Sequence, residues 1–313
     1  MLDSGSVIVV GSANMDLVAY GPKLPSPGET VLADHFRHGP GGKGANQAVA
    51  ASCSGAETTF IGAVGDDTYG DEILGSLRAA RVQVEQVTRI RGVQTGVALI
   101  TVDAAGRNLI TVVPGANEAV DRQIAEKVLT LLSPGVVVLL QLEIPIETVI
   151  LVADLAHTAG ATVVLNPAPA RRLPSELVSC VDILVPNEVE LLSLAAPITV
   201  DRSLGGLARA LLTGATRAVV VTLGKGGVLV VTREDEKRFA AFPVKVVDTT
   251  GAGDTFVGAL ASRIAARDGL GDAVRYANAA AALKVQAKGA QESIPKADDV
   301  YRFMEAVQRQ AAS

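Results

Sequence analysis

Residues 247–256 read VDTTGAGDTF, and this stretch decides the fold because it joins a short apolar run to an alanine-rich helical pattern at 258–266. Gly251 and Gly253 let backbone N–H groups approach a ligand closely, and the start of a helix favours an anion. Asp254 would then lie in the first helical turn, where a carboxylate accepts a proton from a hydroxyl that attacks phosphorus. The stretch therefore predicts a phosphoryl-transfer site. The alternative is an ordinary glycine turn in which Asp254 only stabilises the helix start.

Composition is typical of a globular α/β protein. The chain has 313 residues, of which 49% are hydrophobic and 3% aromatic, with 31 glycines for many short turns. Its net charge of −5 comes from 28 basic and 33 acidic residues without a basic block, which argues against a nucleic-acid partner. The longest apolar run, near 136–140, is too short to span a bilayer, so no membrane association is expected. Residues 1–16 lack the features of a signal peptide, and we expect a cytoplasmic protein with Cys53 and Cys180 as reduced thiols.

Strand and helix patterns alternate over most of the chain. Short β-branched runs closed by glycine or polar residues predict buried strands, and the segments between them have helical length and period. This alternation predicts a three-layer α/β sandwich, with a mostly parallel central sheet flanked by helices. The length allows one large domain or two smaller ones, and the family resemblance given below implies a single domain over 1–313. We expect strands near 6–10, 58–61, 136–140, 162–165, 182–185 and 218–222, a hairpin through 228–242, and helices near 44–54, 69–80, 121–132, 146–159, 187–195, 203–213, 258–266 and 271–286 and from 298.

Two segments, at about 15–40 and 94–115, differ in texture from the rest. The first is broken by glycines and prolines, and the second contains two alternating runs around the turn at 103–106. Together they predict a small β-sheet inserted into the α/β core and covering one face of it. A lid over a phosphoryl-transfer site would exclude water that competes for the phosphoryl group. A structural hairpin or an oligomer interface is the alternative, and a lid does not exclude an interface.

Polar residues gather where the predicted strands end. Asn14 and Asp16 follow the first strand, and further polar residues follow later ones. Ligands of open parallel sheets bind at the carboxyl ends of the strands, so a shared cleft is expected there. Each of these residues taken singly also fits a turn or a helix cap. The others are Gln141, Glu143, Asn166, Asn187, Glu190, Thr222 and Gly224.

The segment 39–48 is a glycine-rich helix start. It satisfies the pattern GxGxxG, but it lacks the preceding buried strand of a dinucleotide-binding unit. It is not a phosphate-binding P-loop either, because Gly44 follows Lys43 where that motif needs Ser or Thr. Lys43 and Asn46 on such a helix start are suited to hydrogen bonds with sugar hydroxyls at close backbone range.

Taken together, these motifs resemble the ribokinase-like (PfkB) sugar kinases over nearly the whole chain. DTTGAGDTF at 248–256 is highly specific for that family, and GGKGANQA at 41–48 together with Asn14 and Asp16 is specific for its ribose-phosphorylating branch. The other matching motifs are GSANMD at 11–16, GDD at 65–67, QLE at 141–143, NPAPAR at 166–171, PNEVE at 186–190, TLGKGG at 222–227 and KGAQESIP at 288–295.

The resemblance implies a role for each matching residue in ATP-dependent phosphorylation of D-ribose at O5, which gives D-ribose 5-phosphate. Asp254 would be the base, and the backbone N–H groups of Gly251, Ala252 and Gly253 would form an anion hole for the transferred phosphoryl group. The residues implied for the ribose hydroxyls are Asn14, Asp16, Gly42, Lys43, Asn46, Glu143 and Asp254. Those implied for Mg²⁺ and ATP are Asn187, Glu190, Thr222, Gly224, Lys225, Gly227, Gly253 and Asn278.

The resemblance also implies activation by K⁺ and a homodimer formed through the lid sheets. The implied K⁺ ligands are Asp248, Ser293 and the backbone carbonyls of Thr250, Lys284, Ala287 and Gly289. Two positions depart from the family's pattern: Asn278 stands where some members have His, and Lys225-Gly226 varies within the nucleotide loop. Both departures concern the fit of the nucleotide rather than the reaction.

Three alternatives to a ribose kinase stay open at this point. The first is a kinase of another furanose or of a nucleoside, such as 2-deoxyribose, fructose or adenosine. Asn14 discriminates here, since a polar group at that position would bond the 2-hydroxyl. The second is a non-catalytic sugar-binding regulator on the same fold, against which the intact Asp254 argues. The third, an NAD-dependent enzyme, rests only on the weak GxGxxG pattern.

Overall fold

An eight-stranded sheet forms the centre of the computed structural model, which describes residues 5–312 and the side chains of 5–309. The strand order is β14-β13-β12-β11-β10-β9-β1-β4; the strands from β12 to β4 run parallel, and β13 and β14 are antiparallel. The chain builds this sheet outward from β1, and the order reverses between β1 and β9. Ligands of open parallel sheets bind outside the strand ends at such a point. The prediction of no signal peptide partly concerns residues 1–4, which lie outside the described residues.

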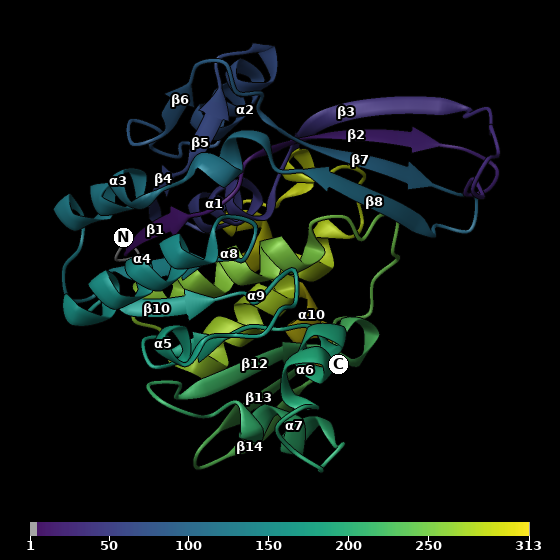
Figure 1. The fold of residues 1–313 in the computed structure, drawn as a ribbon. Coiled ribbons are helices and arrows are strands. Elements are labelled where there is room, and N and C mark those ends of the chain that lie inside the picture. The colour runs from purple at the N-terminus through teal and green to yellow at the C-terminus, as the bar shows by residue number, and fades with distance from the viewer. Residues whose placement is uncertain (1–4, 313) are drawn as a thin grey trace.

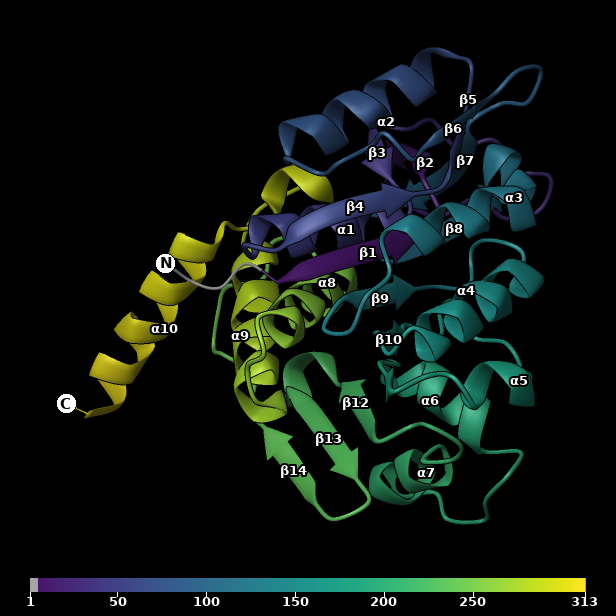
Figure 2. The same cartoon turned by 90° about the vertical axis from the view of Figure 1, so that its left-hand side faces the viewer.

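The helices and the strands of this sheet alternate as the sequence predicts. The strands are β1 (Ser6–Val10), β4 (Glu57–Ile61), β9 (Val137–Leu140), β10 (Thr162–Leu165), β11 (Ile183–Leu184), β12 (Ala218–Thr222), β13 (Val228–Thr232) and β14 (Glu236–Phe239). The helices are α1 (Lys43–Cys53), α2 (Thr68–Ala79), α3 (Arg122–Ala125), α4 (Ile146–Thr158), α5 (Ser175–Val178), α6 (Glu188–Ala195), α7 (Leu204–Ala210), α8 (Ala252–Ala265), α9 (Leu270–Lys284) and α10 (Ala297–Ala312). Helix α10 lies on the outside of the body and carries the C-terminal end away from it (Figure 2).

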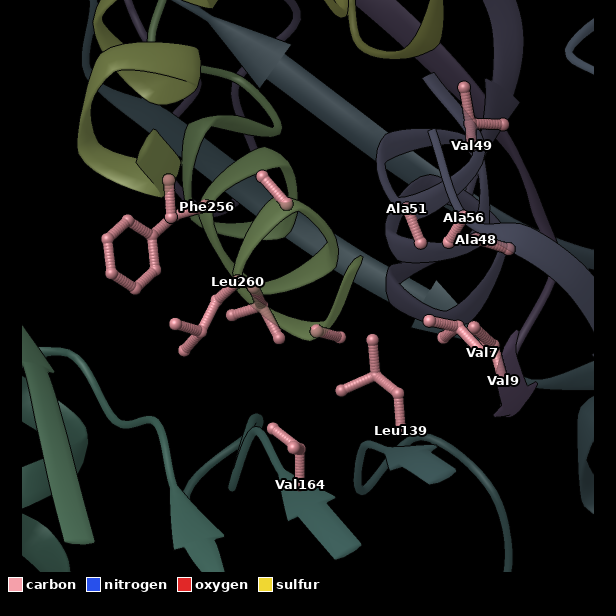
Figure 3. Packing of buried hydrophobic residues seen from close by; sticks show 14 of the residues in the cluster. Val7, Val9, Ala48, Val49, Ala51, Ala56, Leu139, Val164, Phe256 and Leu260 are labelled. Carbon is pink, nitrogen blue, oxygen red and sulfur yellow. The ribbon is translucent and has the colours of Figure 1, made fainter. Parts of the chain in front are cut away.

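Both faces of the sheet are buried, which makes the fold a three-layer sandwich. Alternate residues of β1 point to opposite faces: Val7 and Val9 pack with α1, α2, α8, α9 and α10, whereas Ile8 and Val10 pack with α3 to α7. Figure 3 shows Leu139 and Val164 pointing from the sheet toward Leu260 of α8. Burial on both faces explains why these strands are continuous apolar runs in the sequence rather than alternating ones.

Helices α1 and α8 approach each other closely because Gly258 has no side chain at their contact. A Cβ at Gly258 would overlap the Gln47 carbonyl and lie 2.6 Å from Ala50 Cβ. Only glycine allows the two backbones to come so near. The first turn of α8, which carries Asp254, therefore lies against the first turn of α1, which carries Asn46.

A second, four-stranded sheet extends from the body in the order β3-β2-β7-β8 (Figure 1). Its strands are β2 (Asn14–Tyr20), β3 (His35–Gly41), β7 (Gly96–Val102) and β8 (Asn108–Val113). The two segments expected at about 15–40 and 94–115 thus form a small sheet, as the fold prediction says, and its use as a lid stays a prediction. A third sheet of two strands, β5 (Ala63–Gly65) and β6 (Thr88–Ile90), is not foreseen by the sequence.

Several boundaries differ from the predictions. The expected helix at 121–132 is only the single turn of α3 followed by a 3₁₀ helix, η2 (Glu126–Thr130), and its last turn is tightened by bonds such as Leu131 N–H to Val128 O at 2.9 Å. Helix α7 ends at Ala210 rather than near 213, ahead of Gly214, whose φ of 57° does not continue a helix. Asn14 and Asp16 lie in β2 rather than in a loop, whereas α8 begins at Ala252 and has Asp254 in its first turn, as the sequence predicts.

Two further predictions, on membrane association and on the cysteines, can be compared with the structure. Within residues 5–312, no helix is both long enough and apolar enough to cross a bilayer. Cys53 and Cys180 are free thiols, as expected, and burial raises the pKa of Cys53 above its usual value.

Candidate active site

Asp254 is held by two amide side chains from helix α1. Asn46 Nδ2 donates a hydrogen bond of 3.0 Å to Asp254 Oδ2, and Gln47 Nε2 donates one of 3.0 Å to Asp254 Oδ1. Asn46 is itself fixed by Gln291 of the 3₁₀ helix η4 (Gln291–Ser293), whose Nε2 donates to Asn46 Oδ1 at 3.1 Å. Each carboxylate oxygen has one fixed donor and keeps a lone pair for another partner. The carboxylate is therefore oriented and still able to take a proton.

Gln47 belongs to a buried chain of amides that crosses the ends of the central strands. Its Nε2 also donates to Asn166 Oδ1 at 3.0 Å, and its Oε1 accepts a bond of 2.7 Å from Gln141 Nε2. Gln47 and Gln141 are fully buried, Gln141 follows β9 and Asn166 follows β10. Hydrogen-bonded networks of this kind strengthen each member in a low dielectric and specify one arrangement. The position of Asp254 is thus coupled to the edge of the central sheet.

A cavity of about 140 Å³ opens beside Asp254. Its wall combines the carboxyl ends of β10, β11 and β12 with the start of α8 and of α1. It brings together Lys43, Asn187, Glu190, Thr222 and Asp254, which the sequence placed in one cleft. The full lining is Lys43, Asn166, Ala168, Val185, Asn187, Glu190, Thr222, Gly251, Gly253, Asp254 and Val257.

The start of α8 offers backbone donors to this cavity. Gly251 has a left-handed conformation, with φ of 71°, which favours glycine. The N–H groups of Gly251 and Gly253 have no hydrogen-bond partner among residues 5–312, whereas the Ala252 N–H donates to Thr249 O at 3.1 Å. The N–H groups of Gly251 and Gly253 are therefore free to bind an anion, whereas that of Ala252 closes a turn. The positive end of the α8 dipole adds to the attraction for an anion.

Lys43, Asp16, Glu143 and Asp254 form a dense group of charges at the start of α1. Burial, together with the nearby carboxylates of Glu143 and Asp254, raises the pKa of Asp16 from 3.8 to about 7. Burial alone would lower the pKa of Lys43, but the attraction of Asp254, Glu143 and other carboxylates outweighs it, so the pKa is raised. Lys43 therefore keeps its charge at neutral pH, while Asp16 titrates near neutrality.

Glu143 is tied to the loop that follows β1. Ser12 Oγ donates to Glu143 Oε2 at 2.6 Å, and the Lys43 backbone N–H donates to the same oxygen at 3.1 Å. The chain passes this point at Gly42, with φ of 86°, where a Cβ would lie 2.7 Å from Asn14 N. Glu143 Oε1 is therefore available to a further donor. Only glycine fits at position 42, because its backbone has a positive φ and lies against that of Asn14.

Asn14 is buried and held by a residue distant in sequence. Asn117 Nδ2 donates to Asn14 Oδ1 at 2.7 Å, and Asn117 Oδ1 accepts from the Ala13 N–H at 2.8 Å. The side-chain nitrogen of Asn14, Nδ2, has no hydrogen-bond partner among the residues that the structure describes. It can therefore donate to an oxygen of a ligand.

A second hollow, of about 260 Å³, lies between the small sheet and the loop around Asp248. Asp16, Tyr20 and Arg37 line it from the small sheet, and Asp248 and Gly289 line it from the body. Asp16 thus lies where the small sheet meets the start of α8.

Asn187 and Glu190 form a capping box at the start of α6. Asn187 Oδ1 accepts from the Glu190 N–H at 2.8 Å, and Glu190 Oε2 accepts from the Asn187 N–H at 2.8 Å. Burial raises the pKa of Glu190. Within the described residues no three His, Cys, Asp or Glu side chains are grouped to hold a metal, so a cation here would need phosphate oxygens and water as well. Glu190 Oε1 takes no part in the capping box and is available to bind such a cation.

The remaining residues predicted for the nucleotide are not part of the cavity lining. Gly224 and Lys225 belong to the 3₁₀ helix η3 (Gly224–Gly226), in which Lys225 is exposed. Gly227 has φ of 81°, and a Cβ there would overlap the Phe239 carbonyl. Asn278 Nδ2 donates to Ala240 O at 2.8 Å and so fastens the segment after β14 to α9.

The residues predicted for K⁺ lie around one turn. Asp248 Oδ1 accepts from the Thr250 N–H at 2.9 Å, and Asp248 Oδ2 accepts from the Gly289 N–H at 3.0 Å. Ser293 Oγ donates to Gly289 O at 2.8 Å. The backbone carbonyl of Lys284, the part predicted to bind, accepts from the Ala287 N–H at 3.2 Å.

Four residues that hold the site together have no role in the sequence predictions: Gln47, Gln291, Ser12 and Asn117. Gln47 follows Asn46 in the same helix start, and that position is its only signal in the sequence. Ser12 lies within the motif at 11–16 and Asn117 lies outside every motif. Their hydrogen-bond partners, Glu143 and Asn14, are 131 and 103 residues away along the chain. No local pattern could connect such pairs.

The chain matches the family model described as pfkB family carbohydrate kinase over residues 4–297. It is 40% identical to a ribokinase of Bacillus subtilis over 299 residues, which cover 96% of this chain and 99% of that protein. It is 34% identical to a deoxyribokinase of Salmonella typhimurium over 300 residues, which cover 95% of this chain and 98% of that protein.

A solved structure shares the architecture. The Arabidopsis thaliana ribokinase, complexed with ribose and ATP, has a TM-score of 0.85 and 34% identity, and the match covers 96% of this chain and 98% of that one. The predicted fold class is confirmed by this likeness and by the sheet topology. Because the family model spans nearly the whole sequence and the relatives match from end to end, the chain belongs to the pfkB family of carbohydrate kinases.

Proposed function

We propose that this protein transfers the γ-phosphoryl group of ATP to O5 of D-ribose. The observation that carries the proposal is the oriented Asp254 carboxylate beside the N–H groups of Gly251 and Gly253, which have no hydrogen-bond partner within residues 5–312. In the proposed reaction the O5 proton passes to Asp254, O5 forms a bond to the γ-phosphorus, and the bond to the β–γ bridging oxygen breaks, so that ADP leaves. Ribose is supported by the relatives, one of which binds ribose and ATP.

The proposed anion hole works by stabilising charge as it develops. The free N–H groups of Gly251 and Gly253 point from the start of α8, and Ala252 would join them only if its turn bond to Thr249 opened. Preorganised donors of this kind contribute on the order of 3 kcal/mol each to a transition state. The raised pKa of Lys43 keeps a further positive charge in the same cavity.

The proposed sugar pocket consists of the charged and amide groups at the start of α1. Asp16 and Glu143 would accept hydrogen bonds from sugar hydroxyls, while Lys43 and the free Asn14 amide would donate them. Gly42 would let the backbone approach the sugar, and Asn46 would position Asp254 while meeting the sugar from the same side.

ATP would lie along the other side of Asp254, over the ends of β11 and β12. The polar lining by Asn187, Glu190 and Thr222 suits a triphosphate with Mg²⁺, which keeps water molecules and takes few protein ligands. When bound, the ion would neutralise charge on the phosphates. Gly224, Lys225, Gly227 and Asn278 would border the nucleoside end.

The whole chain is proposed to act as one domain, with the small sheet closing over the sugar. The hollow under that sheet contains Asp16, so closure would bring the sheet onto the substrate. The outer strand β8 is exposed along its length, which suits pairing of lid sheets in a homodimer. Light scattering in solution would report twice the chain mass of 32.1 kDa; a monomer at all concentrations would exclude the dimer.

A 2-deoxyribose kinase is the second candidate, because the deoxyribokinase relative matches 95% of the chain at 34% identity. The Asn14 Nδ2 group, which has no hydrogen-bond partner among the described residues, favours ribose over 2-deoxyribose as the substrate. A site that uses a buried donor for a substrate hydroxyl rejects the analogue that lacks this hydroxyl, because the donor is then left unpaired.

A coupled ADP-release assay across ribose, 2-deoxyribose, fructose and adenosine tests both candidates. We expect ribose to give the highest kcat/KM, with 2-deoxyribose lower by at least about tenfold. Replacement of Asn14 by Ala should narrow this ratio while leaving the rate with 2-deoxyribose nearly unchanged. Equal kcat/KM for the two sugars would contradict the ribose assignment, and no turnover with any of them would contradict the kinase itself.

A further inference from the structure

The turn proposed to hold K⁺ already contains a positive charge. The side chain of Lys284, at the end of α9, is fully buried, and its Nζ donates to Asp248 O at 3.3 Å. Neither this ammonium nor its partner oxygen was predicted from sequence, where Lys284 contributes only its backbone carbonyl. The end of a helix, with its partial negative charge, is a favourable place for a cation.

The carboxylate available to balance this charge is Asp248. Burial lowers the pKa of Lys284, and the charges that act on it are those of Asp248, Glu292, Arg37 and Asp254. Glu292 is held by Arg37, whose Nη2 donates to both of its oxygens at 2.6 and 2.7 Å. Asp254 is held by amides of α1 and faces the cavity. The Asp248 carboxylate is thus the negative charge that balances Lys284 in this turn, and the ammonium itself binds the backbone carbonyl of Asp248.

Four of the six groups offered for K⁺ already take part in hydrogen bonds, whereas the carbonyls of Thr250 and Ala287 accept none among the described residues. Both carboxylate oxygens of Asp248 accept backbone N–H bonds, and the Lys284 carbonyl accepts from Ala287. The Ser293 hydroxyl donates to Gly289 O, which uses one lone pair of that carbonyl. A monovalent cation entering this turn would meet a buried ammonium and one carboxylate for two positive charges. The residues present therefore do not fit K⁺, because the buried ammonium already supplies the positive charge that Asp248 balances.

We infer that the Lys284 ammonium does the work that a monovalent cation would do, so that this enzyme needs no K⁺. The ammonium binds the carbonyl of Asp248, which begins the segment leading through Thr250 to the free N–H of Gly251. It carries one positive charge and oxygen-binding hydrogens, the properties by which a bound cation would order this segment. Being covalently attached and fully buried, it cannot dissociate or exchange with solvent ions.

The experiment compares K⁺ dependence in the wild type and in Lys284→Met, which keeps the length of the side chain and removes its charge. The inference rests on the proposed function only for its activity readout, so thermal unfolding in KCl and in choline chloride is measured alongside ribose phosphorylation. For the wild type we expect less than about a twofold change in kcat/KM with K⁺ and the same Tm in both salts. For Lys284→Met we expect a loss of at least about tenfold in choline, partly restored by KCl or NH₄Cl, and a Tm raised by K⁺.

The wild type alone can overturn the inference, so it does not depend on whether the variant folds. A severalfold stimulation of the wild type by K⁺, or a Tm that rises specifically in K⁺, would show that the ion binds despite the ammonium. Lys288→Met is the matched control, since Lys288 lies in the same turn but is exposed; it should behave as the wild type in both salts. Should no sugar be phosphorylated at all, the proposed function fails, and the two Tm comparisons still decide the question of the cation.

Discussion

The buried amides of α1 bind Asp254, whereas the exposed turn at 224–226 lies outside the lining of the cavity beside Asp254. Gln47 is fully buried and Asn46 nearly so, and their side chains are bonded across three elements of the fold. Lys225 is exposed and has no side-chain hydrogen bond among the described residues. The side that we propose for the sugar is thus organised before any ligand arrives, whereas the side that we propose for the nucleotide has groups that can still be rearranged.

This difference has a chemical reason. The base and the attacking hydroxyl must be placed within a fraction of an ångström for phosphoryl transfer, because misplacement directly costs rate. The nucleoside end of ATP is remote from the reacting atoms and needs affinity more than precision. Substitutions on the sugar side should therefore lower kcat, and those on the nucleotide side should mainly raise the KM for ATP.

Asp254→Asn should produce the largest effect. The amide has nearly the same shape but cannot take the proton from the sugar hydroxyl, so we expect kcat to fall by about 10² or more. Steady-state ADP release measures this. Asp272→Asn, an exposed acid in the first turn of α9, is the control and should keep the wild-type rate. An Asp254→Asn enzyme with wild-type kcat would remove Asp254 from the role of base.

Gln47→Met should have the next largest effect. A hydrogen bond to a charged group contributes about 1.5–3 kcal/mol, so losing the bond to Asp254 should lower kcat by about tenfold to a hundredfold. The KM for ATP should stay within about twofold, since Gln47 contacts no nucleotide residue in the proposed arrangement. Gln286→Met, at an exposed position, is the control. A raised KM for ATP with unchanged kcat would reverse the contrast between the two sides.

Asp16→Asn tests the energetic cost of the charged sugar side. The folded protein holds the Asp16 proton up to about pH 7, whereas the free carboxyl loses it near 3.8. Between these values the folded state binds more protons than the unfolded state, so this group makes stability fall as pH rises across that window. We expect Asp16→Asn to raise the Tm above pH 7 and to leave it unchanged near pH 4, as measured by thermal unfolding at several pH values.

The same substitution should weaken sugar binding by removing an acceptor of hydroxyl hydrogen bonds. A variant with a higher Tm at pH 8 and a severalfold higher KM for ribose would show that stability is given up here for binding. If the Tm of the variant were lower than that of the wild type at every pH, the burial of Asp16 would not be the source of strain that its raised pKa indicates.

Asn278→Ala should have the smallest effect of the four. It removes a neutral hydrogen bond to Ala240 O, of the kind that contributes about 0.5–1.5 kcal/mol, so the KM for ATP should rise by a few fold at most, with kcat unchanged. Lys225→Ala should change the KM for ATP even less, because its side chain is unbonded among the described residues. A tenfold fall in kcat for either variant would mean that the nucleotide side is as tightly organised as the sugar side.

Much of the architecture could be predicted from the sequence because it depends on local pattern. Buried strands such as Ser6–Val10 are short β-branched runs, and their alternation with helices predicts a parallel sheet before any contact is known. The prediction of one helix at 121–132 was wrong, because periodic apolar residues do not distinguish an α-helix from a 3₁₀ helix. Likewise, a motif such as GAGD indicates a helix start and an acid beside it, but not the orientation of that acid.

The sequence by itself determined the family, through motifs that resemble it, and also the three-layer fold and the residue types at the strand ends, which follow from spacing and composition along one chain. Only the tertiary structure decided that Gln47 holds Asp254 and that the Lys284 ammonium enters the turn at Asp248. The physical reason is distance along the chain: Gln47 and Asp254 are 207 residues apart, and Lys284 and Asp248 are 36 apart. Such pairs are fixed by how α1, α8 and α9 pack, and packing depends on the whole core at once.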